Sequence, residues 1–388
     1  METLHSPFGE LTLSRWPKRK NDTLRAWDAA DEYMLQHLAD TSLVNPQIQI
    51  LIINDAFGAL SCALQGCQIS SWSDSRVSHL ATADNIQANA DVEQRSAVQY
   101  LESVDTPSIK YDLVLIKIPK TLSLLEDQLI KLKPYLAEGS QIVAGAMLKH
   151  LPKSAFQLFE KHIGPLSTSL AKKKARLLFI TPNPALNTML NPALNTMLNP
   201  YPTCYFDQAI GLTLSNHANL FSRDHLDLGA RFFLDQFTQL PCANNAIDLA
   251  CGNGVLGIKY QQFHPSASIQ FIDESYMAVA SAKDNYFQAF PDKTERGAFQ
   301  AEDGLTQTAS DSVELILCNP PFHQQHVISE QVAMELFQHS KRCLKTGGEL
   351  WIVANRHLDY STKLNRCFGN SQQVASDKRF VVLRCKKR

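Results

Sequence analysis

The chain has 388 residues, of which 44% are hydrophobic and 19% are charged, so it is long enough for two or three globular domains. Its 37 basic and 38 acidic residues leave a formal net charge of −1, which excludes an overall basic field as a means of attracting nucleic acid. Any basic surface must therefore be local, and candidate segments lie at 16–20, 172–176 and 341–345.

Neither a membrane segment nor a disulfide framework is expected from the sequence. The amino-terminal segment lacks the apolar core of a secretory signal, and no window reaches the roughly 18–20 uninterrupted apolar residues of a membrane span. The nine cysteines are scattered, without a C-x-x-C pair or a spacing typical of metal ligands. We therefore expect a cytoplasmic protein that acts as a monomer, with no membrane contact and no metal.

Apolar runs that end in turn or loop residues alternate with amphipathic stretches along the chain. The runs, which predict strands, lie at 48–54, 112–119, 140–146, 175–180, 245–254, 268–275, 313–321, 349–355 and 379–385. The amphipathic stretches, which predict helices, lie at 23–39, 121–132, 276–288 and 330–343. Strands and helices that alternate at this spacing indicate an α/β fold with a largely parallel sheet.

Segments of the first half of the chain recur in the second half in the same order. The stretch SDSRVSHLATADN at 73–85 corresponds to DESYMAVASAKDN at 273–285. The stretch AWDAADEYMLQHL at 26–38 corresponds to HLDLGARFFLDQF at 225–237. Recurrence in a constant order predicts two copies of one α/β domain.

We therefore expect a first domain at 1–180, a linker at 181–205 and a second domain at 206–388. The linker contains the unit NPALNTML twice in tandem. Its Asn-Pro pairs favour turns and deny helix to the asparagine. We interpret this segment as an irregular connector that has tolerated a duplication, because loops accept insertions at little cost.

A candidate binding loop lies in the stretch AIDLACGNGVLGI at 246–258. An apolar strand carrying Asp248 leads into Gly252 and Gly254, which let the backbone approach a ligand before the next helix supplies oriented amides. Asp273 follows at the end of the next expected strand, where a carboxylate can accept from both hydroxyls of a ribose. Spacing alone leaves NAD and S-adenosylmethionine both open as ligands.

The stretch LCNPPFHQQH at 317–326 ends another expected strand with two consecutive prolines, which fix the backbone of the corner. The side-chain oxygen of Asn319 and the carbonyl oxygen of Pro320 form a candidate pair of acceptors for the two hydrogens of an exocyclic amine. Phe322 offers a face on which a planar base can stack, worth roughly 1–3 kcal/mol. These residues are the candidate catalytic group.

The glycine loop, the acid after the next strand and the NPPF corner together resemble the class I S-adenosylmethionine-dependent methyltransferases. Their pattern is [D/E]-x-x-x-G-x-G, then an acid, then [N/D]-P-P-[Y/F/W] after the fourth strand. The resemblance implies a Rossmann-like domain with S-adenosylmethionine as cofactor. By the same resemblance Asp248, Gly252 and Gly254 lie at its methionine end and Asp273 at its ribose. Asp303 would meet the adenine amine, although a turn-capping aspartate fits Asp303 equally well.

Over essentially its full length the chain is similar to the bacterial ribosomal RNA guanine-N2 methyltransferases, most closely to the methyltransferase G family, which acts on 23S RNA. A relative that acts on 16S RNA, methyltransferase C, shares the architecture. The stretches at 216–234, 317–326 and 353–360 carry the similarity, and the tandem linker departs from it. In the family the F-S-x-x-x-L-D-x-G stretch closes over the cofactor, which implies such a role for Phe221 and Asp227. A helix start is the alternative interpretation of Asp227.

The resemblance implies methylation of a guanine N2 in 23S ribosomal RNA. A guanine in 16S ribosomal RNA is an alternative, because an NPP[Y/F/W] corner fixes the reaction and not the target. The same chemistry also serves the side-chain amide of a glutamine in a protein. A non-catalytic RNA-binding protein is the remaining hypothesis, and it requires the second copy to be inactive.

The first copy lacks the residues on which this chemistry depends. It differs from the second copy at four positions: Ile52 for Asp248, Ala56 for Gly252, Ser73 for Asp273 and Lys117 for Asn319. A lysine can donate but cannot accept a hydrogen bond from an amine. We therefore expect a degenerate first domain whose basic segments at 148–153 and 172–176 contact RNA phosphates. A purely structural role for the first domain is the alternative.

Overall fold

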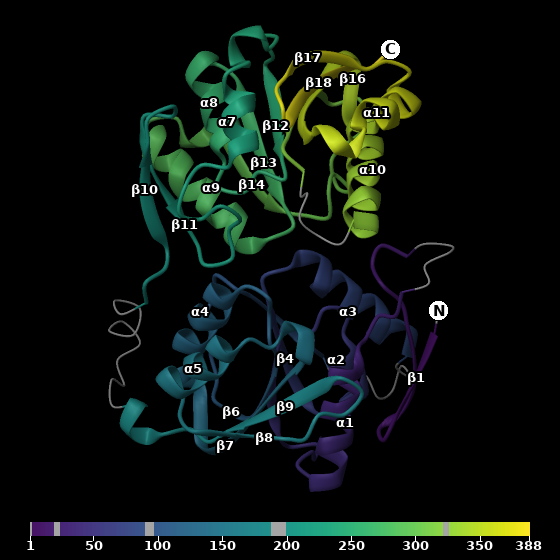
Figure 1. Ribbon diagram of the computed structural model, residues 1–388, viewed down its shortest axis with the longest axis vertical. Helices are drawn as coiled ribbons and strands as arrows, with labels where there is room; N and C mark the ends of the chain where they lie inside the picture. Colours follow the sequence, from purple (N-terminus) through teal and green to yellow (C-terminus); the bar gives the residue numbers. More distant parts are fainter. Residues whose placement is uncertain (1, 19–23, 90–96, 188–198, 321–325) are drawn as a thin grey trace. The chain divides into compact units, whose positions relative to one another are not determined.

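Two seven-stranded sheets with the same strand order organise the chain (Figure 1). The structure is a computed structural model that describes residues 2–18, 24–89, 97–187, 199–320 and 326–388, with the backbone alone at 326–330. The chain divides into two compact parts, Met1–Tyr201 and Pro202–Arg388, which we call unit 1 and unit 2. The predicted α/β class with two Rossmann-like domains is confirmed.

Unit 2 begins with an antiparallel hairpin of β10 (Thr203–Asp207) and β11 (Leu212–Asn216). Its sheet contains, in spatial order, β14 (Gly297–Ala301), β13 (Ser268–Asp273), β12 (Asn245–Leu249), β15 (Val313–Cys318), β16 (Leu344–Asn355), β18 (Phe380–Lys386) and β17 (Gln372–Ser376). The strands from β14 to β16 are parallel, whereas β18 is antiparallel to both of its neighbours. The helices are α7 (Leu228–Leu234), α8 (Val255–Phe263), α9 (Tyr276–Ala289), α10 (His326–Cys343) and α11 (Tyr360–Phe368).

Unit 1 repeats this plan, beginning with a hairpin of β1 (Glu2–Ser6) and β2 (Gly9–Leu13). Its sheet contains β5 (Gln99–Glu102), β4 (Gln68–Ser73), β3 (Gln49–Ile53), β6 (Tyr111–Lys117), β7 (Leu136–Met147), β9 (Ala175–Ile180) and β8 (Leu166–Thr168). The helices are α1 (Ala29–Thr41), α2 (Ala59–Ala63), α3 (Arg76–Asn89), α4 (Leu122–Leu132) and α5 (Lys153–His162). Short 3-10 turns lie at η1 (Lys133–Tyr135), η2 (Leu148–His150), η3 (Pro184–Asn187), η4 (Phe237–Gln239), η5 (Thr294–Arg296) and η6 (Arg356–Leu358).

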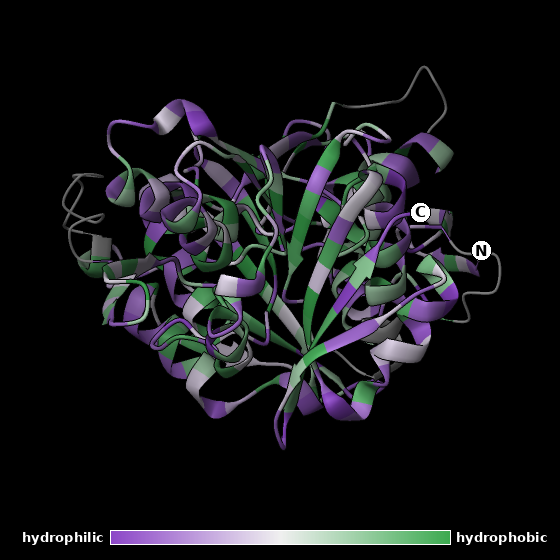
Figure 2. Cartoon of the chain, turned by 90° about the horizontal axis from the view of Figure 1, so that it is seen from above, coloured by the Kyte–Doolittle hydropathy of each residue, from purple (hydrophilic) through white to green (hydrophobic). Residues whose placement is uncertain are grey.

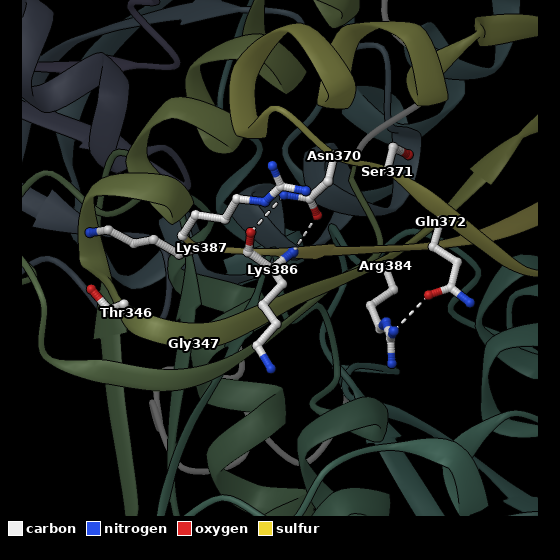
Figure 3. A pocket seen from close by; sticks show the side chains of 9 residues that line it. Thr346, Gly347, Asn370, Ser371, Gln372, Arg384, Lys386 and Lys387 are labelled. Carbon is white, nitrogen blue, oxygen red and sulfur yellow. Dashed lines mark hydrogen bonds between the residues drawn. The ribbon is translucent and has the colours of Figure 1, made fainter.

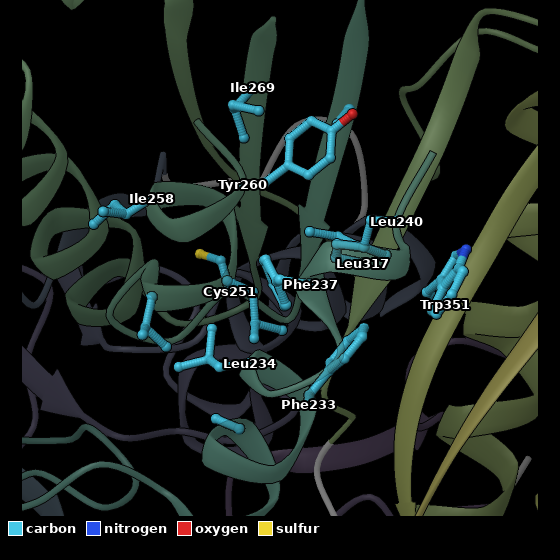
Figure 4. Close-up of a cluster of buried hydrophobic side chains, with 14 of the residues drawn as sticks. Phe233, Leu234, Phe237, Leu240, Cys251, Ile258, Tyr260, Ile269, Leu317 and Trp351 are labelled. Atoms are coloured by element: carbon cyan, nitrogen blue, oxygen red, sulfur yellow. The ribbon is translucent and has the colours of Figure 1, made fainter. Parts of the chain in front are cut away.

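Each sheet is buried on both faces, because helices cover both sides of it. Along β15, Leu315 and Leu317 join the core beneath α7, α8 and α9, and Leu317 is labelled in that core in Figure 4. Ile316 and Cys318 join the core beneath α10 and α11 on the other face. Hydrophobic residues therefore run along the strands, while hydrophilic residues gather in loops and on outer helix turns (Figure 2). Burial on both faces explains why these strands appear in the sequence as continuous apolar runs.

The join between the two units falls inside the segment that we expected to be a linker. Unit 1 ends at Tyr201, and β10 of unit 2 starts at Thr203. Most of the tandem repeat, residues 188–198, lies outside the described residues. The last residue of unit 1, Tyr201, is held against α4, because its hydroxyl donates to Glu126 at 3.0 Å.

Candidate active site

The candidate site residues of unit 2 lie where parallel strands end. The loop after β12 carries Gly252 and Gly254, Asp273 ends β13, and Asn319 directly follows β15. Strands β13, β12 and β15 are adjacent and parallel, so these ends share one edge of the sheet. In a sheet with this order, ligands bind at the carboxyl ends, where connections leave in opposite directions. The sequence therefore predicted residues that the fold brings to one edge.

Gly252 and Gly254 both adopt left-handed backbone conformations, with φ of +54° and +80°, but their surroundings differ. A Cβ on Gly254 would lie 2.9 Å from the Cβ of Ala282 on α9, so this glycine permits close packing of the loop. A Cβ on Gly252 would meet no described atom within 4 Å. The space over Gly252 is therefore where a ligand can approach the backbone.

Asp248 is fully buried in β12 and holds the start of α8. Its Oδ2 accepts from the Gly257 amide at 2.8 Å. Burial raises the pKa of the Asp248 carboxyl well above its usual value; the bond from Gly257 opposes this effect, and the charge of Asp273 adds to it. Its Oδ1 has no hydrogen-bond partner among the described residues. Asp248 thus combines a structural contact with one buried oxygen that is available to a ligand or a water molecule.

Asp273 links the two loops at the centre of the edge. Its Oδ2 accepts from the Gly252 amide at 3.0 Å, and its Oδ1 accepts from the Ser275 amide at 3.1 Å. The carboxylate therefore lies beside the open space over Gly252. The predicted role of Asp273 in accepting from the hydroxyls of a ribose stays a prediction, with which this position is compatible.

Asn319 is held at the end of β15 by a partner distant in sequence. Its Nδ2 donates to Oδ2 of Asp227 at 2.9 Å. Its Oδ1 is buried and has no hydrogen-bond partner in the described part of the chain. Pro320 is buried beside it, whereas Phe322 falls in 321–325, outside the described residues. The amide of Asn319 therefore keeps its accepting half available.

The other predicted cofactor residues have contrasting positions. Asp303 follows β14 at the same edge, is partly buried and begins a turn, because its carbonyl accepts from the Thr306 amide at 3.3 Å. Phe221 is 61% exposed in the loop before α7. Asp227 caps α7 by accepting from the Ala230 amide at 2.9 Å, which is the helix-start position. Cofactor contacts by these three residues remain predictions.

Two cysteines lie among these strand ends but do not offer thiolate chemistry. Burial raises the pKa of both Cys251 and Cys318 well above the usual value for a thiol, and nearby carboxylates raise it further. The described residues contain no cluster of three or more side chains that could hold a metal ion. Within the same residues, no helix is long and apolar enough to cross a membrane.

Comparison with known proteins identifies the family. Residues 1–184 match the model of the RLMG N-terminal domain, and residues 211–384 match that of the methyltransferase small domain. The ribosomal RNA large subunit methyltransferase G of Ectopseudomonas mendocina is 47% identical over 388 residues, with 100% of both chains covered. That of Pseudomonas aeruginosa (strain UCBPP-PA14) is 44% identical over 392 residues, again with 100% coverage of both.

The chain belongs to the ribosomal RNA large subunit methyltransferase G family. It is therefore a methyltransferase, and the resemblance predicted from the sequence is confirmed. A solved 16S rRNA N2 methyltransferase from T. thermophilus, in complex with AdoMet and guanosine, shares the fold with a TM-score of 0.73. Its sequence is 18% identical to this one, and the match covers 100% of this chain and 98% of the T. thermophilus chain.

In this member of the methyltransferase G family, unit 1 keeps the packing glycine and lacks the open one. Gly58 has φ of +80°, and a Cβ there would lie 2.8 Å from Thr82, so it corresponds in role to Gly254. Ala56 stands where unit 2 has Gly252. The capping carboxylate has also moved, because Asp55 in the loop accepts from the Ser61 amide at 2.9 Å, whereas Ile52 occupies the strand position.

Lys117 occupies the strand end in unit 1 that Asn319 occupies in unit 2. Its Nζ lies 2.8 Å from Asp28 and 2.6 Å from Asp31, at the start of α1. Burial lowers the pKa of the Lys117 amine, but the charges of Asp31 and Asp28 outweigh burial and raise that pKa above its usual value. The first copy thus fills this corner with an ion pair in place of an acceptor.

Sequence reasoning missed an asparagine that fastens the binding loop. Asn285 on α9 donates to the carbonyl of Asn253 and to that of Ser215, both at 3.0 Å. In unit 1, Asn85 donates to the carbonyl of Phe57 at 2.8 Å in the same way. The signal was present, since both residues end the repeated segment at 73–85 and 273–285.

A separate hollow of about 460 Å³ lies at the opposite, amino edge of the unit 2 sheet (Figure 3). Its lining includes six basic and amide residues: Asn370, Gln372, Arg384, Lys386, Lys387 and Arg388. Part of this charge is already paired, because Arg384 donates to Gln372 at 2.6 Å and Lys387 to Asp311 at 2.8 Å. The hollow contains none of the residues of the candidate active site.

Proposed function

We propose that the protein transfers a methyl group from S-adenosylmethionine to the N2 amine of a guanine in 23S ribosomal RNA, in the cytoplasm. The observation that carries this proposal is the buried, unpartnered Oδ1 of Asn319 among the described residues, at the strand end next to the glycine loop. The names of the full-length relatives support the choice of the large-subunit RNA. A protein glutamine substrate would give unit 1 no evident role.

The described residues fit the cofactor at the glycine loop. The open space over Gly252 admits a ligand to the backbone, and Asp273 beside it accepts hydrogen bonds. When bound, S-adenosylmethionine supplies an electrophilic methyl group on a positively charged sulfur. We assign Gly252 and Asp273 to holding it, and Oδ1 of Asp248, buried in the strand before this loop, has no hydrogen-bond partner among the described residues.

The corner after β15 can activate an amine that is a poor nucleophile. The lone pair of an exocyclic amine is delocalised into the ring of the base. Acceptors at the Asn319 side chain and the Pro320 carbonyl would bind its two hydrogens and favour a pyramidal nitrogen whose lone pair is free to attack. A dedicated base is unnecessary, because the amine proton becomes acidic as the new bond forms. The target guanine must be unstacked or lie in a loop to reach this corner.

We also propose that unit 1 contacts the phosphates of the RNA through a basic surface. We define this surface by five exposed lysines: Lys120, Lys149, Lys172, Lys173 and Lys174. The two predicted basic segments are adjacent, because the amide of Leu148 donates to the carbonyl of Lys174 at 2.8 Å. Burial lowers the pKa of His150 in the first of these segments, and the charges of Lys120 and Lys149 lower it further.

The reaction is tested by methyl transfer from tritiated S-adenosylmethionine. The acceptors are naked 23S RNA, 16S RNA, assembled ribosomal subunits and a release factor, and labelled RNA is digested to nucleosides. Label in N2-methylguanosine from 23S RNA, naked or assembled, is expected. Label in protein, or in 16S RNA alone, would overturn the proposed substrate.

The basic surface is tested by Lys149→Gln combined with Lys172→Gln. We expect weaker binding of 23S RNA fragments and a shallower dependence of affinity on salt, by about one unit of slope per lost phosphate contact. Lys110→Gln is the control, because Lys110 is exposed before β6 at the opposite edge of the same sheet. Equal effects of the double variant and of the control on the salt slope would contradict an RNA role for this surface.

A further inference from the structure

The start of α7 and the end of β15 are joined by a single carboxylate oxygen. Oδ2 of Asp227 accepts from the Ala230 amide at 2.9 Å and from Nδ2 of Asn319 at 2.9 Å. The first bond fixes Asp227 as the cap of the helix. The second then ties the Asn319 side chain to that fixed point.

This contact decides which half of the Asn319 amide is presented to a ligand. An amide can rotate by half a turn and exchange its oxygen for its NH₂ group. A carboxylate oxygen only accepts, so the NH₂ group must face Asp227 and Oδ1 must face away. Oδ1 is the buried oxygen that has no partner among the described residues.

Gly229 lies so close to the Asp227 carboxylate that a larger residue would not fit at this position. A Cβ added to Gly229 would lie 3.0 Å from Oδ2 of Asp227 and 3.4 Å from the ring of Phe380. A side chain at this position would therefore press on the same oxygen that holds Asn319. The absence of a side chain at Gly229 keeps the carboxylate in its bridging position.

Unit 1 contains the same connection with different chemistry. Asp28 caps α1 by accepting from the Ala30 amide at 2.8 Å, and it pairs with Lys117 at 2.8 Å. The link between helix start and strand end thus exists in both units, but only in unit 2 does it leave an acceptor. The link therefore belongs to the fold, and its use to orient an acceptor is specific to unit 2.

We propose that Asp227 is a positioning residue, which holds the Asn319 amide with its oxygen toward the amine of the target base. The inference rests on the proposed function. Without Asp227, the NH₂ half of the amide can face the amine, where it donates and cannot accept. The resemblance to known methyltransferases had implied a cofactor contact for Asp227, so the two roles predict different kinetics.

The test compares Asp227→Ser with Asp227→Asn in the full-length protein. Serine can still cap α7 but is too short to reach Asn319, whereas asparagine retains an oxygen at the same reach. We expect Asp227→Ser to lower kcat roughly 10- to 100-fold, because the acceptor is misplaced. Its dissociation constant for S-adenosylmethionine and its melting temperature should change little. Asp227→Asn should recover most of the lost kcat.

Asp28→Ser is the matched control, because it alters the equivalent cap in unit 1 and should leave kcat at saturating RNA unchanged. A normal kcat in Asp227→Ser would overturn the positioning role, and so would a loss of kcat in Asp227→Asn as large as that in Asp227→Ser. A proportional loss of S-adenosylmethionine binding would also overturn it and would favour a cofactor contact. An inactive wild-type protein on every RNA would overturn the proposed function as well, which separates the two failures.

Discussion

Units 1 and 2 share one strand order and one pattern of helix cover, yet they differ where their strands end. Both keep a glycine packed against the third helix and an asparagine that fastens the loop, at Gly58 and Asn85 in one and Gly254 and Asn285 in the other. Groups that the fold needs are therefore present twice. Groups present only in unit 2, such as Gly252 and Asn319, are the ones to assign to the ligands.

The comparison also separates two roles of the Asp248 side chain, one in holding a helix and one toward a ligand. A carboxylate accepts from the first turn of the helix after the loop in both units, but it comes from Asp248 in unit 2 and from Asp55 in unit 1. The first turn of this helix therefore needs a carboxylate as an acceptor, but that carboxylate can come from the strand or from the loop. The remaining oxygen of Asp248 is therefore the part of that residue that can serve the ligand.

The largest effect on catalysis should follow from removing the acceptor. We expect Asn319→Ala to lower turnover roughly 10²- to 10³-fold, because the transition state loses an oriented hydrogen-bond partner. S-adenosylmethionine should still bind with nearly normal affinity. Single-turnover methyl transfer and calorimetry measure the two quantities, and a near-normal rate would show that this corner is not catalytic.

The three glycines of the two loops should respond differently to alanine. Gly252→Ala should weaken S-adenosylmethionine binding about tenfold or more, because a Cβ enters the open space and the left-handed backbone costs alanine about 1 kcal/mol. Gly254→Ala and Gly58→Ala should instead destabilise their units by about 1–3 kcal/mol through overpacking. Urea unfolding and calorimetry measure these effects. Normal cofactor affinity in Gly252→Ala would show that Gly252, for which unit 1 has Ala56, does not determine which loop binds the cofactor.

Lys117→Met should destabilise unit 1 without affecting chemistry in unit 2. The change leaves Asp31, whose side chain is 7% exposed, without its cation. Removing one partner of a buried pair costs roughly 3–5 kcal/mol. The free energy of unfolding and kcat at saturating RNA are the measurements. A large loss of kcat in a folded variant would mean that unit 1 takes part in the reaction.

A smaller effect, on the pH dependence of stability, should arise at Glu126 in unit 1, which accepts a hydrogen bond from Tyr201 at the end of this unit. Burial pushes the pKa of Glu126 up, but hydrogen bonds from Lys161, His162 and Tyr201 lower it to about 2. Because the folded-state pKa lies below the ordinary 4.5, the resulting stability is present above pH 4.5 and is lost as the pH falls toward 2. The difference in unfolding free energy between wild type and Glu126→Gln should therefore shrink over that range. A difference independent of pH would contradict this account.

Much of the fold was accessible from the sequence because its central strands are buried on both faces and appear as apolar runs. Strand β4 was missed, since QISSWS contains three serines that are nevertheless buried. Strand β14 was expected only through the resemblance, as the third strand before Asp303, because GAFQA is short, only partly buried and not an apolar run. Strands of this kind are specified by their neighbours in the sheet more than by their own residues.

The candidate site was predictable residue by residue, but its connections were not. Motif spacing indicated Gly252, Asp273 and Asn319, since each lies at or within three residues of the end of a strand, and these strand ends share one edge of the sheet. The bond between Asp227 and Asn319 joins residues 92 positions apart, so no local pattern contains it. The ion pair of Lys117 was likewise not predictable. The lysine in place of Asn319 showed that unit 1 lacks the acceptor, but it did not show that Asp28 and Asp31 bind the lysine.

The central claim is that one of the two copies binds the cofactor and performs the reaction. Calorimetric titration of the full-length protein with S-adenosylmethionine tests it most directly. One equivalent bound per chain, lost or much weakened in Gly252→Ala, is the predicted result. Two equivalents per chain, or one equivalent that Gly252→Ala leaves unchanged, would contradict it.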